Sequence, residues 1–145
     1  MSQRISMVTL GVADLDRSRA FYAAWGWTSR QATADIVFYQ LNGLVLGLFG
    51  LDALAEDQGR PGTPLGMGAM TLAQNYPTEA EVDERFETAL AAGATELKRP
   101  QQAPWGGYSG YIADPDGHVW ELAVNPFWET GQDGTTVIPE HLPES

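Results

Sequence analysis

Residues 107–126 read GYSGYIADPDGHVWELAVNP, in which two apolar runs flank the turn sequence DPDG at positions 114–117. Proline and aspartate early in such a segment and glycine at its end are typical of a tight turn, so the sequence predicts a β-hairpin. Side chains alternate between the two faces of a strand, and an odd number of positions separates His118 from Glu121. The hairpin therefore presents Glu121 on one face of a sheet and His118 on the other.

The first half of the chain predicts a strand, a helix and three more strands. Alternating apolar residues indicate a strand over 5–12, and apolar residues at helical spacing indicate a helix over 15–25. A short strand is expected over 27–30. The Asn-Gly pair at positions 42–43 readily adopts a tight hairpin turn, so residues 35–50 are expected to form two antiparallel strands. The first half is therefore a βαβββ module.

The second half of the chain repeats this order. A strand is expected over 66–75, and the capping-box sequence TEAE at 78–81 opens a helix that Gly93 ends. A short strand over 95–97 then leads into the hairpin. The prediction is one domain, 1–145, made of module one (4–50), a Gly- and Pro-rich connector (51–65), module two (66–126) and a C-terminal tail (127–145).

The composition of the chain limits the partners that it is expected to bind and the chemistry that its side chains can supply. The 145 residues carry 19 acidic and 8 basic side chains, and the formal net charge of -11 repels phosphate backbones and anionic lipids. We therefore expect no nucleic acid and no membrane partner. Long apolar segments and a leader pattern are lacking, so a cytoplasmic location is expected. Without cysteine, this chain has no disulfide, thiolate metal ligand or cysteine nucleophile.

Two motifs together, VTLGVADLDRSRAFYAAWGW at 8–27 and GYSGYIADPDGHVWELAVNP at 107–126, resemble the vicinal oxygen chelate superfamily. This superfamily includes glyoxalase I, extradiol dioxygenases and the bleomycin resistance proteins. The resemblance covers roughly residues 4–126. It implies an α+β fold in which two βαβββ modules form a U-shaped mixed sheet around a concave cavity that holds a small-molecule ligand. Many relatives pair as dimers, so we also expect a homodimer.

The resemblance implies where a metal would bind, because metal-dependent relatives take their ligands from the opening and closing strands of each module. Aligning the two modules on their opening strands and turn glycines places Met7, Gly47, Ala69 and Glu121 at these four positions. Methionine, glycine and alanine do not supply the imidazole or carboxylate that zinc and iron sites need. We therefore expect no metal and no other cofactor. The second histidine, His141, lies in the tail.

Glu121 is the residue expected to carry the chemistry of the cavity. It would anchor a ligand or act as a general base. The alternative is that Glu121 is solvated or paired with Lys98 or Arg99, a common outcome for acidic residues. The loop at 99–111 places aromatic residues beside a Gly-Gly pair, which suits either a lid over a planar ligand or a simple cover for the open end of the sheet. The side chains expected to line the cavity are Thr9, Phe38, Gln40, Phe49, Met67, Thr71, Trp105, Tyr108, Tyr111 and Glu121.

Taken with the resemblance, these residues favour a glyoxalase/bleomycin-resistance-like protein that binds a small organic molecule in its concave sheet without a metal. One alternative is a divalent-metal enzyme, either a glyoxalase-type lyase or a dioxygenase. Such enzymes are frequent in the family, which favours this alternative. The lack of metal-binding side chains at three of the four aligned positions argues against it. A second alternative is a metal-free isomerase or lyase that uses Glu121 as general base. Glycine-rich phosphate loops and local Ser-His-Asp signatures are absent.

Overall fold

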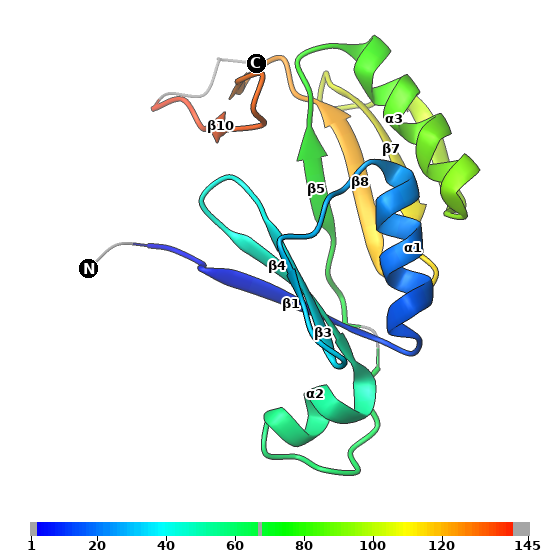
Figure 1. The fold of residues 1–145 in the computed structure, drawn as a ribbon. Coiled ribbons are helices and arrows are strands. Elements are labelled where there is room, and N and C mark those ends of the chain that lie inside the picture. The colour runs from blue at the N-terminus through cyan, green and yellow to red at the C-terminus, as the bar shows by residue number, and fades with distance from the viewer. Residues whose placement is uncertain (1–2, 67, 141–145) are drawn as a thin grey trace. The chain divides into compact units, whose positions relative to one another are not determined.

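The computed structural model describes residues 3–66 and 68–140 (Figure 1). These ranges contain two four-stranded mixed sheets and three helices, which confirms the predicted α+β class. None of the helices in this part of the chain is long and apolar enough to cross a membrane. The chain divides into two compact units, described separately below: unit 1 comprises Met1–Ala69 and Pro115–His118, and unit 2 comprises Met70–Asp114 and Val119–Ser145.

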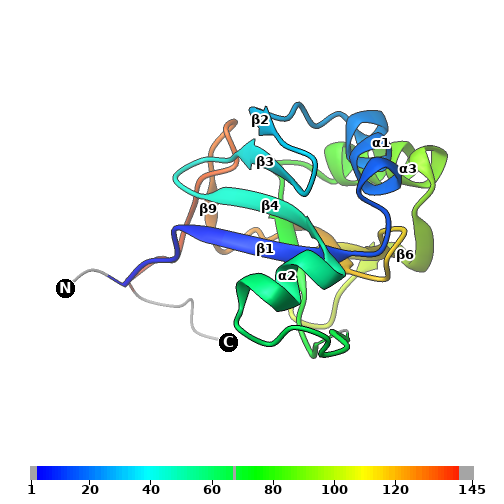
Figure 2. The same ribbon diagram turned by 60° about the horizontal axis from the view of Figure 1, so that its bottom comes forward.

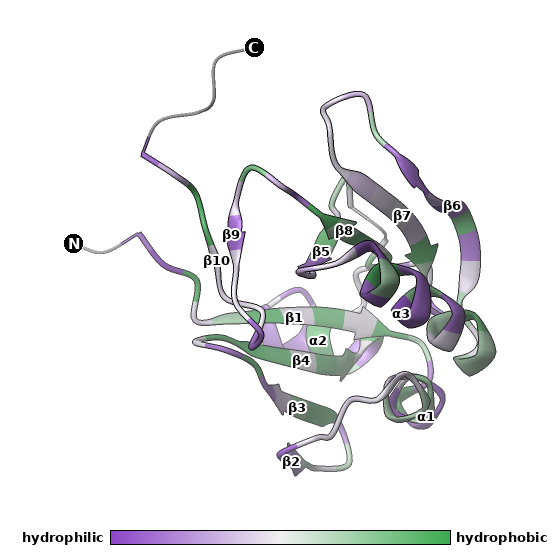
Figure 3. Cartoon of the chain, turned by 90° about the horizontal axis from the view of Figure 1, so that it is seen from above, coloured by the Kyte–Doolittle hydropathy of each residue, from purple (hydrophilic) through white to green (hydrophobic). Residues whose placement is uncertain are grey.

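Unit 1 contains a mixed sheet with the strand order β1-β4-β3-β2 (Figure 2). β1 (Met7–Val12) runs parallel to β4 (Val45–Gly50), and β3 (Ile36–Gln40) is antiparallel to both β4 and β2 (Gln31–Ala32). β1 at one edge of the sheet and β4 beside it are both coloured largely as hydrophobic in Figure 3. The hairpin predicted over 35–50 is therefore confirmed.

Helix α1 (Leu15–Trp25) begins and ends at residues suited to those positions. The Asp14 side chain accepts a hydrogen bond from the backbone N–H of Arg17, and Gly26 adopts the left-handed conformation, with φ of 108°, that closes many helices. The apolar side of the helix includes Tyr22 and Trp25, which are fully buried in unit 1. Burying one such aromatic side chain stabilises the fold by about 2–3 kcal/mol relative to its exposure.

The strand predicted over 27–30 lies too early in the chain, because β2 begins at Gln31, opposite Phe38. Within the predicted range, Arg30 donates its backbone N–H to the carbonyl of Phe38 at 2.8 Å. The backbone N–H of Trp27 donates to the carbonyl of Tyr22, which extends the closing turn of α1. The indole of Trp27 then stacks on Trp25 with ring centroids 5.9 Å apart. Residues 27–29 therefore complete the aromatic core and do not add a strand.

The connector predicted over 51–65 begins with a helix that belongs to the core. Helix α2 (Leu51–Asp57) contacts β1 and β4, and Ala55 within it is buried. A Cβ atom on Gly11 would lie 2.8 Å from a methyl carbon of Leu51. Glycine at position 11 therefore lets α2 lie close against β1.

Unit 2 contains the second sheet, with the strand order β5-β8-β7-β6. β5 is parallel to β8, whereas β7 is antiparallel to both β8 and β6. The strand predicted from residue 66 begins only at residue 72, and the short strand predicted over 95–97 extends to residue 102. The bounds are β5 (Leu72–Asn75), β6 (Thr95–Gln102), β7 (Tyr108–Ala113) and β8 (Val119–Val124).

Helix α3 (Glu79–Ala92) covers one face of the sheet in unit 2 through contacts with β6, β7 and β8. The Thr78 hydroxyl accepts a hydrogen bond from the N–H of Glu81, and Gly93 ends the helix with φ of 114°, as the sequence predicts.

The tail forms a separate antiparallel pair, β9 (Glu129–Thr130) and β10 (Thr136–Val137).

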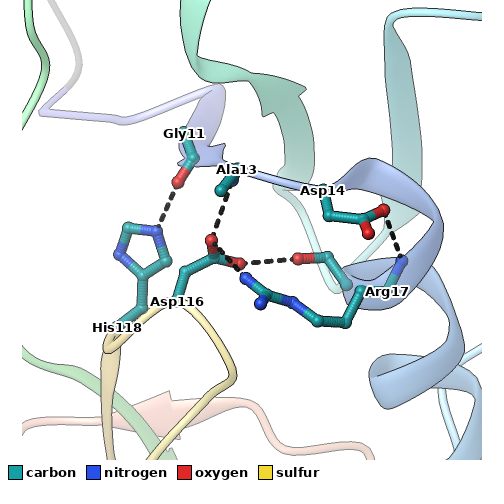
Figure 4. A network of polar contacts seen from close by, with 7 residues as sticks. Gly11, Ala13, Asp14, Arg17, Asp116 and His118 are labelled. Atoms are coloured by element: carbon teal, nitrogen blue, oxygen red, sulfur yellow. Dashed lines mark hydrogen bonds and ion pairs between the residues drawn. The ribbon is translucent and has the colours of Figure 1, made fainter.

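The turn between β7 and β8 belongs to unit 1, although both strands belong to unit 2. Asp116 in this turn accepts hydrogen bonds from the backbone N–H of Ala13 at 2.8 Å, the guanidinium of Arg17 at 3.1 Å and the hydroxyl of Ser18 at 2.8 Å (Figure 4). His118 contributes a contact of 2.7 Å between its Nε2 and the carbonyl oxygen of Gly11. One carboxylate therefore fixes the turn to the start of α1.

We expect Asp116→Ala to lower the free energy of unfolding by about 2–3 kcal/mol, because hydrogen bonds to a charged group are lost together from a nearly buried side chain. Urea denaturation followed by far-ultraviolet circular dichroism measures the effect. Glu84→Gln, at an exposed position of α3, is the matched control and should change stability by less than about 0.5 kcal/mol. Equal stability of the two variants would show that the turn is held by other contacts.

Candidate functional site

A hollow of about 250 Å³ lies on the face of the unit 2 sheet opposite α3. The alternation of side chains along β8 explains its position, because Trp120 and Leu122 are buried on the helix side whereas Glu121 and Ala123 point the other way. The lining residues are Ala73, Asn75, Trp105, Glu121, Ala123, Asn125 and Trp128.

The floor of this hollow is formed by neighbouring strands. In the parallel pairing of β5 with β8, Ala73 lies beside Glu121 and Asn75 lies beside Ala123. Alanine at two of these four positions leaves space above the sheet, and Asn75 adds an amide that can donate or accept hydrogen bonds. Glu121 is therefore the single charged group on a floor that is otherwise small and neutral.

Glu121 makes one hydrogen bond within the described residues. Its Oε2 accepts a bond of 3.0 Å from the hydroxyl of Tyr111, the residue directly opposite on β7. Burial raises the pKa of the Tyr111 hydroxyl above its usual value, and the hydrogen bond to Glu121 and the charge of that carboxylate raise it further. Arg99 pairs with Glu87 at 2.9 Å and with Glu96 at 3.0 Å. Among the residues that the structure describes, Glu121 forms no ion pair with Lys98 or Arg99, so the expected alternative is not found.

Two indole rings border the hollow. Trp105 is 46% exposed and lies in a tight turn in which the N–H of Ala103 donates to the carbonyl of Gly107 at 2.7 Å. A Cβ atom on Gly107 would lie 1.9 Å from the ring of Trp105. The Gly-Gly pair, expected as a flexible part of a lid, thus serves here to let the indole fold closely over the backbone.

The second indole, Trp128, reaches the hollow because the chain turns after β8. The side-chain oxygen of Asn125 accepts a hydrogen bond of 2.9 Å from the N–H of Phe127, and the N–H of Trp128 donates to the carbonyl of Asn125. This Asx turn redirects the chain immediately after the last strand of the sheet. Trp128 and Asn125 therefore both line the hollow.

The structure separates the two tyrosines that the sequence placed in one cavity. Tyr108 lies three positions before Tyr111 on the same strand, so it points to the opposite face. Its hydroxyl donates to Asp83 of α3 at 2.5 Å, and Tyr108 lines a different hollow with Phe86 and Arg99. The sequence predicts Tyr108 in the same cavity as Glu121, and the structure places it on the other face. Trp105 and Tyr111 do lie next to Glu121.

The remaining predicted site residues lie outside this hollow. In unit 1, Thr9 and Phe38 meet above Gly47, whose added Cβ would be 3.4 Å from the Thr9 hydroxyl oxygen and 3.6 Å from the Phe38 ring. Gln40 is exposed and its side chain donates to the carbonyl of Leu41. Phe49 lies in β4 on the same face as Gly47, and Thr71 is exposed just before β5. Met67 and His141 lie outside the described residues.

The family model described as Glyoxalase/Bleomycin resistance protein/Dioxygenase superfamily matches residues 4–122. The chain belongs to this superfamily. A solved structure of a glyoxalase-related enzyme from Fulvimarina pelagi is 40% identical, with a TM-score of 0.88 over 94% of this chain and 99% of that one. A lactoylglutathione lyase from Agrobacterium tumefaciens is 26% identical, with a TM-score of 0.69 over 88% of this chain and 98% of that one.

Among curated proteins, an uncharacterized protein of Mycobacterium bovis is 37% identical over 75 residues, which are 52% of this chain and 48% of that protein. The match spans about half the length of this relative. These comparisons establish the superfamily, and the fold described above agrees with it.

Metal-dependent members of the superfamily need several ligands, and the residues beside Glu121 do not provide them. The observed register corrects the alignment of the two modules by two positions, because Ala73 lies beside Glu121 as Thr9 lies beside Gly47. A shift of two positions keeps the same face of the strand and again places an alanine next to Glu121. Within residues 3–66 and 68–140, no three His, Cys, Asp or Glu side chains come together as a metal centre requires.

Sequence reasoning missed five residues that line the hollow of this superfamily member. Ala123 follows from the same alternation that placed Glu121, since it lies two positions further along β8. Ala73 and Asn75 depend on the register of a parallel pairing, which joins segments far apart in the chain. Asn125 is followed by proline, a pair that is typical of a turn. This turn brings Trp128 back to the sheet.

We expect Glu121→Gln to lower the pKa of the Tyr111 hydroxyl, because a carboxylate charge that favours the protonated phenol is removed. Burial, the largest cause of the shift, remains, so the pKa should stay above the usual value. In the wild type this pair contributes stability that is fully present below the unfolded pKa of tyrosine and is lost as pH rises through the folded pKa.

The ¹³Cζ chemical shift of labelled tyrosine, followed from pH 8 to about 12.5, measures this titration. Tyr111→Phe identifies the resonance. An unchanged midpoint in Glu121→Gln would contradict the contact between the two side chains.

Proposed function

We propose that this protein binds a small organic cation with a planar apolar body in the hollow around Glu121. The observation that carries the proposal is a single carboxylate on a floor of small residues, bordered by the indoles of Trp105 and Trp128. Glu121 anchors the charged group of the ligand, and the two indoles contact its planar part. Asn75 and Asn125 offer amide groups at the same hollow.

The chemistry of each group supports this class of ligand. A hydrogen bond to a charged group contributes about 1.5–3 kcal/mol, and a cation near the face of an indole gains about 0.5–2 kcal/mol. The hydroxyl of Tyr111 donates to Oε2 of Glu121, and Oε1 can accept a hydrogen bond from a cationic ligand. The net charge of -11 attracts cations from solution.

The proposal also covers the location, the oligomeric state and the cofactor use of the protein. We place it in the cytoplasm, as a homodimer that uses no metal or other cofactor. The donor set beside Glu121 supports metal-free binding, since its strand neighbours Ala73 and Tyr111 include no imidazole or second carboxylate. The balance of acidic over basic residues supports a partner other than nucleic acid or a membrane.

A second candidate function is a glyoxalase-type enzyme. It is favoured by the likeness to a protein named as a glyoxalase-related enzyme at 40% identity, and by the more distant lactoylglutathione lyase. In this candidate Glu121 acts as a general base or as one ligand of a divalent metal. A dioxygenase remains the other enzyme class that the superfamily description names.

Elemental analysis separates the first candidate from the metal-dependent form of the second. We expect the purified protein to hold less than about 0.1 equivalent of zinc, nickel, iron or manganese per chain, because three of the four aligned ligand positions lack donor atoms suited to these metals. One equivalent of metal, whose removal by a chelator abolishes a lyase or dioxygenase activity, would favour the enzyme.

Binding to an aromatic amine tests the first candidate. A thermal-shift screen of planar aromatic amines and glycopeptide-like antibiotics supplies a ligand, and calorimetry then gives its dissociation constant. We expect Glu121→Gln to keep the fold and to weaken binding by about 1.5–3 kcal/mol, the range for a hydrogen bond to a charged group.

His118→Gln is the control, because His118 contacts Gly11 in unit 1 and glutamine can still donate to that carbonyl. Binding should change little in this variant. Equal losses in both variants would place the histidine at the site, and no loss in Glu121→Gln would leave that residue without a role in binding.

A further inference from the structure

Resting on the proposed function, we infer that Tyr111 determines which cation the hollow accepts: it selects ammonium ions over guanidinium ions. The basis is the unequal use of the two oxygens of Glu121. Oε2 accepts the hydrogen bond of 3.0 Å from the Tyr111 hydroxyl. Oε1 accepts none from the residues that the structure describes.

The two classes of cation make different demands on a carboxylate. A guanidinium group is planar and binds best through two parallel N–H···O bonds, one to each oxygen. An ammonium group is a compact charge with three donors, and it needs only one oxygen. Tyr111 fills one of the two acceptor positions of Oε2. An ammonium ion can bind through Oε1 alone, whereas a guanidinium ion that binds through both oxygens must share Oε2 with the phenol or displace it.

The phenol is not easily displaced. Tyr111 and Glu121 are directly opposed in the antiparallel pairing of β7 and β8, so their backbones hold the side chains together. β7 lies between β6 and β8, and Lys98 is opposite Tyr111 on the other side. A guanidinium ligand that took the place of the hydroxyl would break a hydrogen bond to a charged group and leave the partly buried phenol without it.

Tyr111→Phe removes the hydroxyl and keeps the ring, which makes both oxygens of Glu121 available. The preference for an ammonium ion should then fall or reverse. Tyr108→Phe makes the same chemical change on the opposite face, where the hydroxyl contacts Asp83, and it is the matched control.

The probes are 1-naphthylmethylammonium, 1-naphthylmethylguanidinium and the neutral 1-naphthylmethanol, which share one planar body. Calorimetry at pH 7 gives the dissociation constants for the wild type and for Tyr111→Phe, Tyr108→Phe and Glu121→Gln. We expect the wild type and Tyr108→Phe to bind the ammonium probe more tightly than the guanidinium probe. In Tyr111→Phe the ratio of the two constants should shift toward guanidinium by about fivefold or more, the effect of one hydrogen bond.

The outcomes distinguish the two proposals. Weaker binding of both cations by Glu121→Gln, with the same ammonium-to-guanidinium ratio in the wild type and Tyr111→Phe, overturns the role of Tyr111 and leaves the proposed function standing. If Glu121→Gln binds both cations as the wild type does, or if neither cation binds the wild type better than the alcohol, the proposed function fails and this inference fails with it.

A second measurement does not require the Tyr111→Phe variant to fold. In labelled wild-type protein, saturation with the guanidinium probe should move the ¹³Cζ resonance of Tyr111 more than saturation with the ammonium probe, because only the former competes for Oε2. Equal shifts with both probes would overturn the inference.

Discussion

The carboxylate of Asp116 is the contact on which the arrangement of the hairpin depends. It gathers a backbone N–H, a guanidinium and a hydroxyl from the residues that open α1, while its side chain is only 7% exposed. The strands on either side of this turn form the centre of the other sheet. A nearly buried carboxylate needs such donors, because an unsatisfied charge of this kind is costly to bury. The same hairpin thus contains Asp116, which accepts several hydrogen bonds, and Glu121, whose Oε2 accepts one from Tyr111.

The local features of the fold could be read from the sequence, because each depends on few neighbouring residues. Asp14 caps α1 and Thr78 caps α3 through side-chain contacts three positions along the chain. The sequence allows a helical turn at the start of the connector, but the packing of α2 could not be read in this way. Its place is decided by the close approach of Leu51 to Gly11, a contact between segments that no local pattern connects. The alignment of the opening strands of the two modules was wrong by two positions for the same reason.

The part of the candidate site that depends on side-chain alternation along a single strand could be predicted from the sequence. Alternation along β8 placed Glu121 on the face that has the hollow, and the same rule applied to β7 separates Tyr108 from Tyr111. Both tyrosines were nevertheless expected to line one cavity, because residues 99–111 were interpreted as a loop, whereas β7 begins at Tyr108. Trp128 is different, because its position follows from the Asx turn at Asn125 and from no periodic pattern.

Membership of the superfamily does not determine the chemistry of this chain, and Gly47 shows why. A Cβ atom at this position would meet Thr9, Phe38 and Ile36 at 3.4, 3.6 and 3.7 Å, which are ordinary van der Waals distances. The face of the unit 1 sheet therefore has room for a Cβ atom at this position. The same fold can carry either a glycine or a residue with a side chain here, so the fold alone does not fix the donor atoms. Glu121 is in the reverse situation, because its neighbours Tyr111 and Ala73 supply one hydrogen-bond donor and open space, the conditions under which a lone carboxylate can hold a cation from solution.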